Sequence, residues 1–319
     1  MKAVVFDKYG SLENLRIEEV PKPEPKSDEV RIKVHAASLN SADLQLIRGK
    51  LSSRVIAGLL KPGKVIPGID VAGMVDAMGP DAIGCQWGQE VYADLSEYGY
   101  GGFAEYVCVP KSAIAMKPKN LSYVESSAVP MAATAAFQGL VDHGSMLSYR
   151  SAMIIGASGG VGHFAVQIAK NYDLQVTAVT RTENVDFVKS LGADYVIASD
   201  QVDHMNKRDH YELIFDTIAE ISARKYRKML TRDGKYVACA FSPSAVLQSP
   251  IGGILSNKRI VTFGLHPDMD DLATIRNMIE KGNVRPRIDK VFSIEDSIEA
   301  LRYLADRKAQ GKVVINMES

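Results

Sequence analysis

The sequence contains few cysteines, and they are not clustered. Three occur in 319 residues, at Cys85, Cys108 and Cys239, and no pair has C-x-x-C spacing. This distribution excludes a disulfide framework and a cysteine-based zinc knot. We therefore expect buried, reduced thiols.

The chain also lacks an excess of either charge and any long apolar run. Lys and Arg together number 38, as do Asp and Glu, so nothing in the balance favours nucleic acid or an anionic membrane. No run approaches the roughly 20 apolar residues of a membrane span, and Lys2 and Asp7 place charge too early for a signal peptide. We expect a cytoplasmic protein with small-molecule partners, no nucleic acid and no membrane.

The remaining composition supports two domains, because hydrophobic residues make up 46% of the chain. Residues 1–121 contain short apolar runs separated by Pro and Gly, which indicates a β-rich, barrel-like domain. In residues 122–265 strands alternate with helices, which implies an α/β domain with a doubly wound parallel sheet. Residues 266–319 return to the first pattern and are predicted to complete the first domain, with the active site in the cleft between the two.

A glycine cluster provides the main functional signal. The apolar run Met153–Ile155 meets Gly156-Ala157-Ser158-Gly159-Gly160-Val161-Gly162, and an apolar stripe at helical spacing follows. A strand, tight turn and helix of this kind present free N–H groups to a phosphate. The spacing departs from G-x-G-x-x-G, with Ala157 in the first glycine position. We expect Ser158, Gly159, Gly160 and Val161 to meet the pyrophosphate of a dinucleotide.

The segment after the next predicted strand, Gln175–Val179, favours NADPH over NADH. An NAD enzyme usually keeps a carboxylate there, for the ribose 2′-hydroxyl. This chain has Thr180-Arg181-Thr182, and Arg181 can donate two charge-assisted hydrogen bonds to a 2′-phosphate, with Thr180 beside it. The alternative is a solvated Arg at a strand end, with glycines that serve only a turn.

Further elements follow from periodicity and turn signals. Helices are expected at 123–142, 183–191, 221–230, 270–280 and 294–304, with a turn at Asp233-Gly234. A short helix after Asn40 should end at Gly49, with Asp43 as its cap. The β-prone run Ile260–Phe263 is expected at the edge of the sheet, where two copies could pair as a homodimer. The alternative is a monomer whose edge is covered by Pro243–Ser256.

In this order, the motifs of the chain resemble the medium-chain dehydrogenase/reductase superfamily, and within it the zinc-free quinone oxidoreductase branch. They are Asn40…Asp43…Gly49, Pro67-Gly68-Ile69-Asp70-Val71-Ala72-Gly73, Gly88-Gln89-Glu90-Val91, Gly101-Gly102-Phe103-Ala104-Glu105-Tyr106, Thr134-Ala135, the glycine cluster, Leu191-Gly192-Ala193-Asp194 and Gly311-Lys312-Val313-Val314. The resemblance implies a Rossmann-type domain inserted into a GroES-like catalytic domain. It also implies hydride transfer from NADPH to a quinone or an α,β-unsaturated carbonyl, and dimers formed through the sheet edge.

The resemblance also bears on metal and catalysis. Zinc-dependent relatives place Cys where Asn40 stands and His-Glu where Ile69-Asp70 stand, and the six histidines here show no zinc spacing, so we expect no metal. Asn40 is the first catalytic candidate, with a turn-capping role as its alternative. Gln45 stands where many quinone reductases carry a Tyr, and it can donate a hydrogen bond but cannot act as an acid.

Two further cofactor residues follow from position in the family. Thr217 and Gly264 are expected near the nicotinamide half. The electron acceptor is not identified, because its choice depends on unpatterned segments such as Ser52–Lys64 and Pro243–Ile254. A zinc-free alcohol or aldehyde reductase and a non-catalytic NADPH-binding protein remain open alternatives.

Overall fold

The computed structural model describes residues 1–50, 54, 58, 60–200, 208, 210–239 and 257–318. The chain forms two compact units. Unit 1 consists of Met1–Met131, Pro267–Glu280 and Pro286–Ser319, and unit 2 of Ala132–His266 and Lys281–Arg285. The candidate substrate-selecting segments fall largely outside the described residues: all of 243–254, and most of 52–59.

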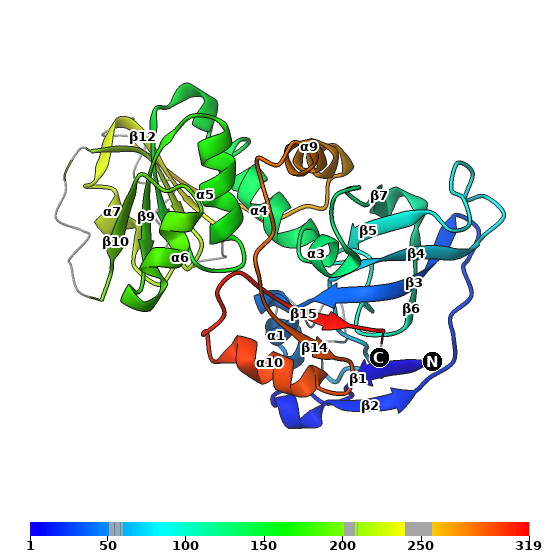
Figure 1. Cartoon of the computed structure of the whole chain (residues 1–319). Helices are drawn as coiled ribbons and strands as arrows, with labels where there is room; N and C mark the ends of the chain where they lie inside the picture. The colour runs from blue at the N-terminus through cyan, green and yellow to red at the C-terminus, as the bar shows by residue number, and fades with distance from the viewer. Residues whose placement is uncertain are drawn as a thin grey trace. The chain divides into compact units, whose positions relative to one another are not determined.

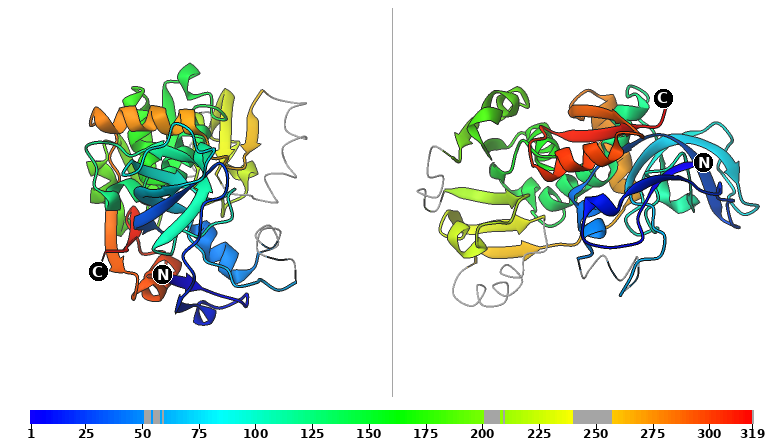
Figure 2. Two further views of the ribbon diagram at one scale, coloured as in Figure 1. Left: turned by 90° about the vertical axis from the view of Figure 1, so that its right-hand side faces the viewer. Right: turned by 90° about the horizontal axis from the view of Figure 1, so that it is seen from below.

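Unit 1 is built on a largely antiparallel sheet that is assembled from both ends of the chain. Its strands lie in the order β14 (Ile288–Ser293), β15 (Lys312–Asn316), β3 (Glu29–Ser38), β4 (Asp70–Met78), β5 (Glu90–Asp94) and β7 (Ile114–Met116), and β6 (Tyr106–Pro110) pairs with β3. A separate two-stranded sheet joins β1 (Lys2–Val5) to β2 (Arg16–Glu19). The first strand β1 and the last strand β15 therefore belong to one unit (Figures 1 and 2).

Short helices cover the sheets of unit 1. They are α1 (Ser41–Arg48), α3 (Tyr123–Ser127), α9 (Met269–Glu280) and α10 (Ser297–Ala305). As expected, α1 ends at Gly49, whose φ of 68° lies in the left-handed region that glycine adopts without strain. Most of its apolar residues face inward, because Leu44, Leu46 and Ile47 join the large core cluster of this unit.

Unit 2 contains a six-stranded, wholly parallel sheet. The order is β10 (Tyr195–Ala198), β9 (Gln175–Thr180), β8 (Ser151–Ile155), β11 (Tyr211–Asp216), β12 (Leu230–Ala238) and β13 (Arg259–Thr262). Its helices are α4 (Pro130–Leu140), which starts in unit 1, α5 (Gly162–Asn171), α6 (Val185–Ser190) and α7 (Ala223–Tyr226) (Figure 1). The strand order reverses between β8 and β11, where ligands of such sheets bind. The predicted fold class is confirmed.

Two predicted helices are wrong in extent. The helix expected at 123–142 is divided into α3 and α4 at Pro130, because proline lacks the N–H that a continuous helix needs but is well suited to a first helical turn. The helix expected at 221–230 keeps only the four residues of α7. Leu230 instead pairs with Tyr211 as the first residue of β12. The predicted turn at Asp233-Gly234 therefore lies within β12, where the register between β11 and β12 shifts.

Candidate functional site

The glycine turn of unit 2 is tightly packed on one side. Gly156 follows β8 with a φ of 78°, and a Cβ there would lie 2.5 Å from Thr217 Oγ1 and 2.7 Å from Ile218 Cγ1. A Cβ at Gly162 would lie 2.1 Å from the Gly156 carbonyl oxygen. Both glycines are therefore required by close approach of the strand, the turn and the following helix.

The other side of the turn is open. A Cβ at Gly159 would meet only the Gly156 carbonyl oxygen, at 3.4 Å. Within the described part of the chain, the backbone N–H groups of Gly160, Val161 and Gly162 have no hydrogen-bond acceptor in the protein. Free donors at the start of a ten-residue helix suit a phosphate group, so the residues present fit the pyrophosphate of a dinucleotide.

Ser158 is held in this turn by two buried side chains. Thr180 Oγ1 donates to Ser158 Oγ at 3.0 Å, and Asn184 Nδ2 donates to the same oxygen at 3.1 Å. Thr180 is 5% exposed and Asn184 is 3% exposed. The hydroxyl of Thr180 therefore donates within the glycine turn, and its contact with a 2′-phosphate stays a prediction. Asn184 could not be predicted from local sequence patterns, because its contact with Ser158 joins residues 26 positions apart.

Arg181 lies at the carboxyl end of β9, and its side chain is half exposed. Two carboxylates lie near it, and their proximity was not predicted from the sequence. Its Nη1 lies 3.3 Å from Glu183 Oε1. Thr182 donates from its backbone N–H and its hydroxyl to Asp200 Oδ1, at 2.9 and 3.0 Å. These bonds lower the pKa of Asp200, against the opposing effect of desolvation, and the Arg181 charge contributes to the decrease. Arg181 thus has two acidic neighbours, Glu183 and Asp200.

Thr217 and Gly264 both lie in unit 2, at the carboxyl ends of β11 and β13. Thr217 Oγ1 donates to the Ile155 carbonyl at 2.9 Å, which ties the two central strands together at the switch point. The loop after Thr217 is anchored by Asp216, whose Oδ1 accepts from the N–H groups of Ile218 and Ala219 and whose Oδ2 accepts from the Tyr236 hydroxyl. Gly264 is exposed, and a Cβ added there would meet no atom of the described residues within 4 Å.

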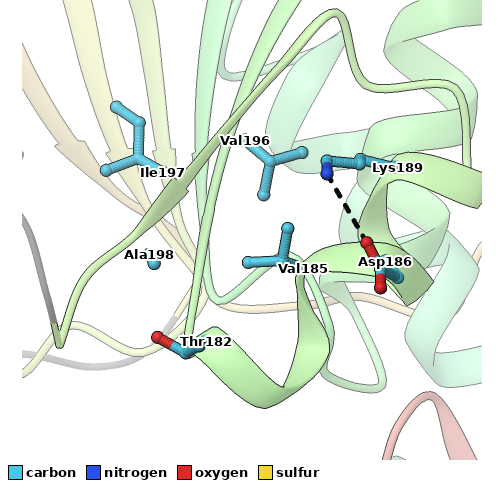
Figure 3. Close-up of a pocket in the computed structure, with 7 residues that line it drawn as sticks. All are labelled: Thr182, Val185, Asp186, Lys189, Val196, Ile197 and Ala198. Atoms are coloured by element: carbon cyan, nitrogen blue, oxygen red, sulfur yellow. Dashed lines mark hydrogen bonds and ion pairs between the residues drawn. The ribbon is translucent and has the colours of Figure 1, made fainter.

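A separate hollow lies between α6 and β10 (Figure 3). Val185, Val196, Ile197 and Ala198 supply its apolar lining, and Lys189 Nζ lies 3.5 Å from Asp186 Oδ1 at its rim. Thr182 also lines it, but none of the residues predicted to bind the cofactor does. The hollow therefore adds nothing to the predicted phosphate site.

In unit 1, Asn40 lies within a buried polar network. It is the N-cap residue of α1, and its Nδ2 donates to Asp70 Oδ2 at 2.9 Å while its Oδ1 accepts from Lys312 Nζ at 2.6 Å. Asp70 Oδ2 also accepts from Ser38 Oγ, and Lys312 Nζ lies 3.3 Å from the same oxygen. Both ends of the Asn40 amide are therefore used inside the unit, and Asn40 is only 8% exposed.

Asp43 and Asp94 are the other buried carboxyl groups of this region. Asp43 caps α1 as expected, because its Oδ2 accepts from the Asn40 N–H, and its Oδ1 accepts from Gly68 N–H. Asp94 pairs in register with Asp70 across β4 and β5, but its Oδ2 has no hydrogen-bond partner among the described residues. Desolvation, followed for Asp94 by the negative charge of Asp70, raises the pKa of Asp43 and Asp94 to about 7 each.

The residues present do not fit a catalytic zinc. The places of the usual ligands hold an amide, Asn40, that is already bonded at both ends and a carboxylate, Asp70, that is neutralised by the ammonium of Lys312. Among the described residues, no group of three His, Cys, Asp or Glu side chains is placed to hold a metal ion.

Gln45, the other predicted catalytic residue, lies one turn along α1, and its side chain is half buried.

Two family models match the chain. Residues 26–119 match the alcohol dehydrogenase GroES-like domain, and residues 191–315 match a family described as zinc-binding dehydrogenase. The structure of a quinone oxidoreductase from Coxiella burnetii superposes with a TM-score of 0.90 at 24% identity, covering 100% of this chain and 99% of that one. This structural likeness establishes the fold.

Curated relatives make the match more specific. The chain is 33% identical to the NADPH-dependent alkenal/one oxidoreductase of Arabidopsis thaliana, over 99% of this chain and 79% of that protein. It is also 33% identical to quinone-oxidoreductase QR1 of Triphysaria versicolor, over 99% of this chain and 98% of that protein. The chain belongs to the medium-chain dehydrogenase/reductase superfamily, in its zinc-free quinone oxidoreductase branch. Its members are oxidoreductases that bind a nicotinamide cofactor.

The same relatives contradict the expectation of a cytoplasmic protein, because both are named as chloroplastic. The composition could not predict the compartment, because a folded enzyme of this kind has the same charge balance and hydrophobic core in any aqueous compartment. Among the described helices, none has the length and apolar character needed to cross a membrane.

Proposed function

We propose that this protein is a zinc-independent oxidoreductase that transfers hydride from NADPH to a quinone or an α,β-unsaturated carbonyl. The names of the two curated relatives support both acceptor classes. The observation that carries the proposal is the glycine turn of unit 2, which offers unsatisfied N–H donors at the start of α5.

Each half of the dinucleotide has candidate contacts in unit 2. Ser158, Gly159, Gly160 and Val161 would hold the pyrophosphate, and Arg181 the 2′-phosphate. Thr217 and Gly264, at strand ends near the switch point, would approach the nicotinamide half. The bound cofactor would supply the hydride, and the chain's own groups would orient the acceptor and exclude water.

Catalysis without a metal requires hydrogen-bond donors for the acceptor's carbonyl oxygen. Gln45 is the candidate donor of unit 1, because its side chain is half buried and carries an amide N–H. Asn40 is the other catalytic candidate, and the orientation of its amide is fixed by Asp70 and Lys312. Neither amide is an acid, so we assign proton delivery to water.

A turnover screen with purified protein tests this function. Loss of NADPH absorbance is expected with quinones or enones, and activity should survive dialysis against a strong chelator. Turnover of aldehydes alone would instead indicate a zinc-free alcohol or aldehyde reductase. Tight NADPH binding without turnover of any acceptor would indicate a non-catalytic binding protein. Activity that is lost to the chelator and restored by zinc would contradict the metal-free site.

We further propose that the protein forms a homodimer through β13. This strand ends the sheet of unit 2, and within the described residues it pairs with β12 alone.

A further inference from the structure

Asn184 occupies a helix N-cap position but does not cap its helix. It precedes α6, where an Asn side chain commonly accepts a hydrogen bond from an N–H group of the first turn. No such side-chain bond is present in this part of the described chain. The Asn184 amide instead donates to Ser158 Oγ in the glycine turn, from a position that is 3% exposed.

The two hydrogen bonds that Ser158 Oγ accepts determine the role of its own hydroxyl hydrogen. Ser158 Oγ accepts from Asn184 Nδ2 and from Thr180 Oγ1, which uses both acceptor sites of the oxygen. The hydroxyl hydrogen of Ser158 is then left to be donated. Ser158 is partly exposed and lies next to the free N–H groups at the start of α5, so its hydrogen adds one more donor to the same phosphate site.

We propose that Asn184 is a positioning residue for the dinucleotide pyrophosphate, acting through Ser158, with Thr180 as the second support. This inference rests on the proposed dinucleotide binding, but not on the choice between NADPH and NADH, which share the pyrophosphate. It assigns no contact between Asn184 and the cofactor.

The test compares Asn184→Ala and Asn184→Asp. The alanine variant removes one donor and frees the Ser158 hydroxyl to rotate. The aspartate variant is nearly isosteric, but its carboxylate would accept the Ser158 hydrogen and add negative charge. We expect NADPH dissociation constants to rise about 3-fold to 10-fold for Asn184→Ala, the loss of one hydrogen bond, and further for Asn184→Asp. Thermal melting of both variants checks that they fold.

Two further measurements separate positioning from general destabilisation. Adenosine 2′-monophosphate, which lacks the pyrophosphate, should compete with NADPH for the wild type and for both variants with the same affinity. In a Ser158→Ala background, Asn184→Ala should have no additional effect on NADPH binding. Three results would each overturn the inference. The first is that the variants bind the monophosphate more weakly to the same extent as they bind NADPH. The others are affinity losses of Asn184→Ala and Ser158→Ala that add in the double variant, and unchanged NADPH binding by a folded Asn184→Asp protein. A wild type that binds neither NADPH nor NADH would instead contradict the proposed function.

Discussion

The guanidinium of Arg181 would attract a phosphate, but the carboxylate of Glu183 competes for the same guanidinium. Its guanidinium lies 3.3 Å from the Glu183 carboxylate, and both side chains are at least half exposed. An exposed ion pair of this kind contributes about 0.2–1 kcal/mol, whereas a charged hydrogen bond to phosphate contributes about 1.5–3 kcal/mol. The phosphate should therefore displace Glu183 rather than be excluded by it.

Two substitutions at this position should shift cofactor affinity in opposite directions. Arg181→Ala should weaken NADPH binding by about 1.5–3 kcal/mol and leave NADH nearly unchanged. Glu183→Gln should tighten NADPH about 1.5-fold to 5-fold relative to NADH, because it removes the competing carboxylate. Titration of each variant with both cofactors gives the values.

Asp173→Asn provides the matched control, since it removes another exposed carboxylate of unit 2. It should change neither affinity. Equal affinity of the wild type for NADPH and NADH would show that Arg181 does not select the 2′-phosphate.

Asp94 is the least satisfied carboxyl group of the buried cluster in unit 1. Asp70 accepts from Ser38, Asn40, Lys312 and the Met131 N–H. Asp94 accepts from the Ser96 N–H on Oδ1, but its Oδ2 has no hydrogen-bond partner in the part of the chain that the structure describes. Desolvation, followed by the negative charge of Asp70, disfavours the ionised form and raises the pKa of Asp94 from 3.8 to about 7.

This shift predicts a pH dependence of stability. Between pH 3.8 and about 7 the folded state holds a proton on Asp94 that the unfolded state has released, so stability decreases as pH rises through that window. Asp94→Asn removes one titrating group. Its free energy of unfolding should therefore decrease less than that of the wild type between pH 5 and pH 7, with a difference of up to about 1.4 kcal/mol per pH unit.

Urea unfolding at several pH values measures the difference. Some dependence should remain in the variant, because burial also raises the pKa of Asp43 to about 7. The exposed Asp270→Asn serves as control and should reproduce the wild-type curve. Parallel curves for wild type and Asp94→Asn would show that Asp94 titrates normally.

At the scale of elements, the position of α4 on the parallel sheet depends on Gly139. A Cβ at this residue would lie 2.3 Å from Cε2 and 2.6 Å from Cζ of Phe215 in β11, and the Phe215 ring is fully buried. Alanine ordinarily favours a helix interior by about 1 kcal/mol over glycine. Here overpacking of about 1–3 kcal/mol opposes that preference.

Gly139→Ala should therefore destabilise the protein despite its better helix propensity, by up to about 2 kcal/mol in the free energy of unfolding. Gly63→Ala should be close to neutral, because a Cβ there would meet no atom of the described residues within 4 Å. The added mutation Phe215→Leu, which makes room for the methyl group, should recover part of the loss from Gly139→Ala. A stabilised Gly139→Ala protein would mean that α4 moves away at little cost.

Local patterns predicted the elements that depend on neighbouring residues. The turn between β8 and α5 follows from glycines within seven positions, and the end of α1 follows from Gly49. The contacts that define the sites depend on distant residues and could not be predicted this way. Lys312 reaches Asn40 across 272 positions and Asn184 reaches Ser158 across 26, and neither contact leaves a periodic signal.

At the scale of the whole molecule, strand β13 forms one edge of the parallel sheet of unit 2. Strand β13 carries Ile260, which is buried, and Val261 and Thr262, which are partly exposed. Phe263 is covered on one face by His143, with ring centroids 4.6 Å apart. The segment Pro243–Ser256, the alternative cover for this edge, lies outside the described residues.

Pairing of two β13 strands about a two-fold axis would satisfy the outward N–H and C=O groups of both edges and extend the sheet. We therefore expect light scattering at micromolar concentration to give twice the 34.8 kDa mass of the chain. Val261→Pro, which removes a strand donor, should shift the protein towards monomer. Val196→Pro, a matched change in β10 at the opposite edge, should leave the dimer intact. A wild-type monomer, or a dimer that tolerates Val261→Pro, would place the interface elsewhere or rule it out.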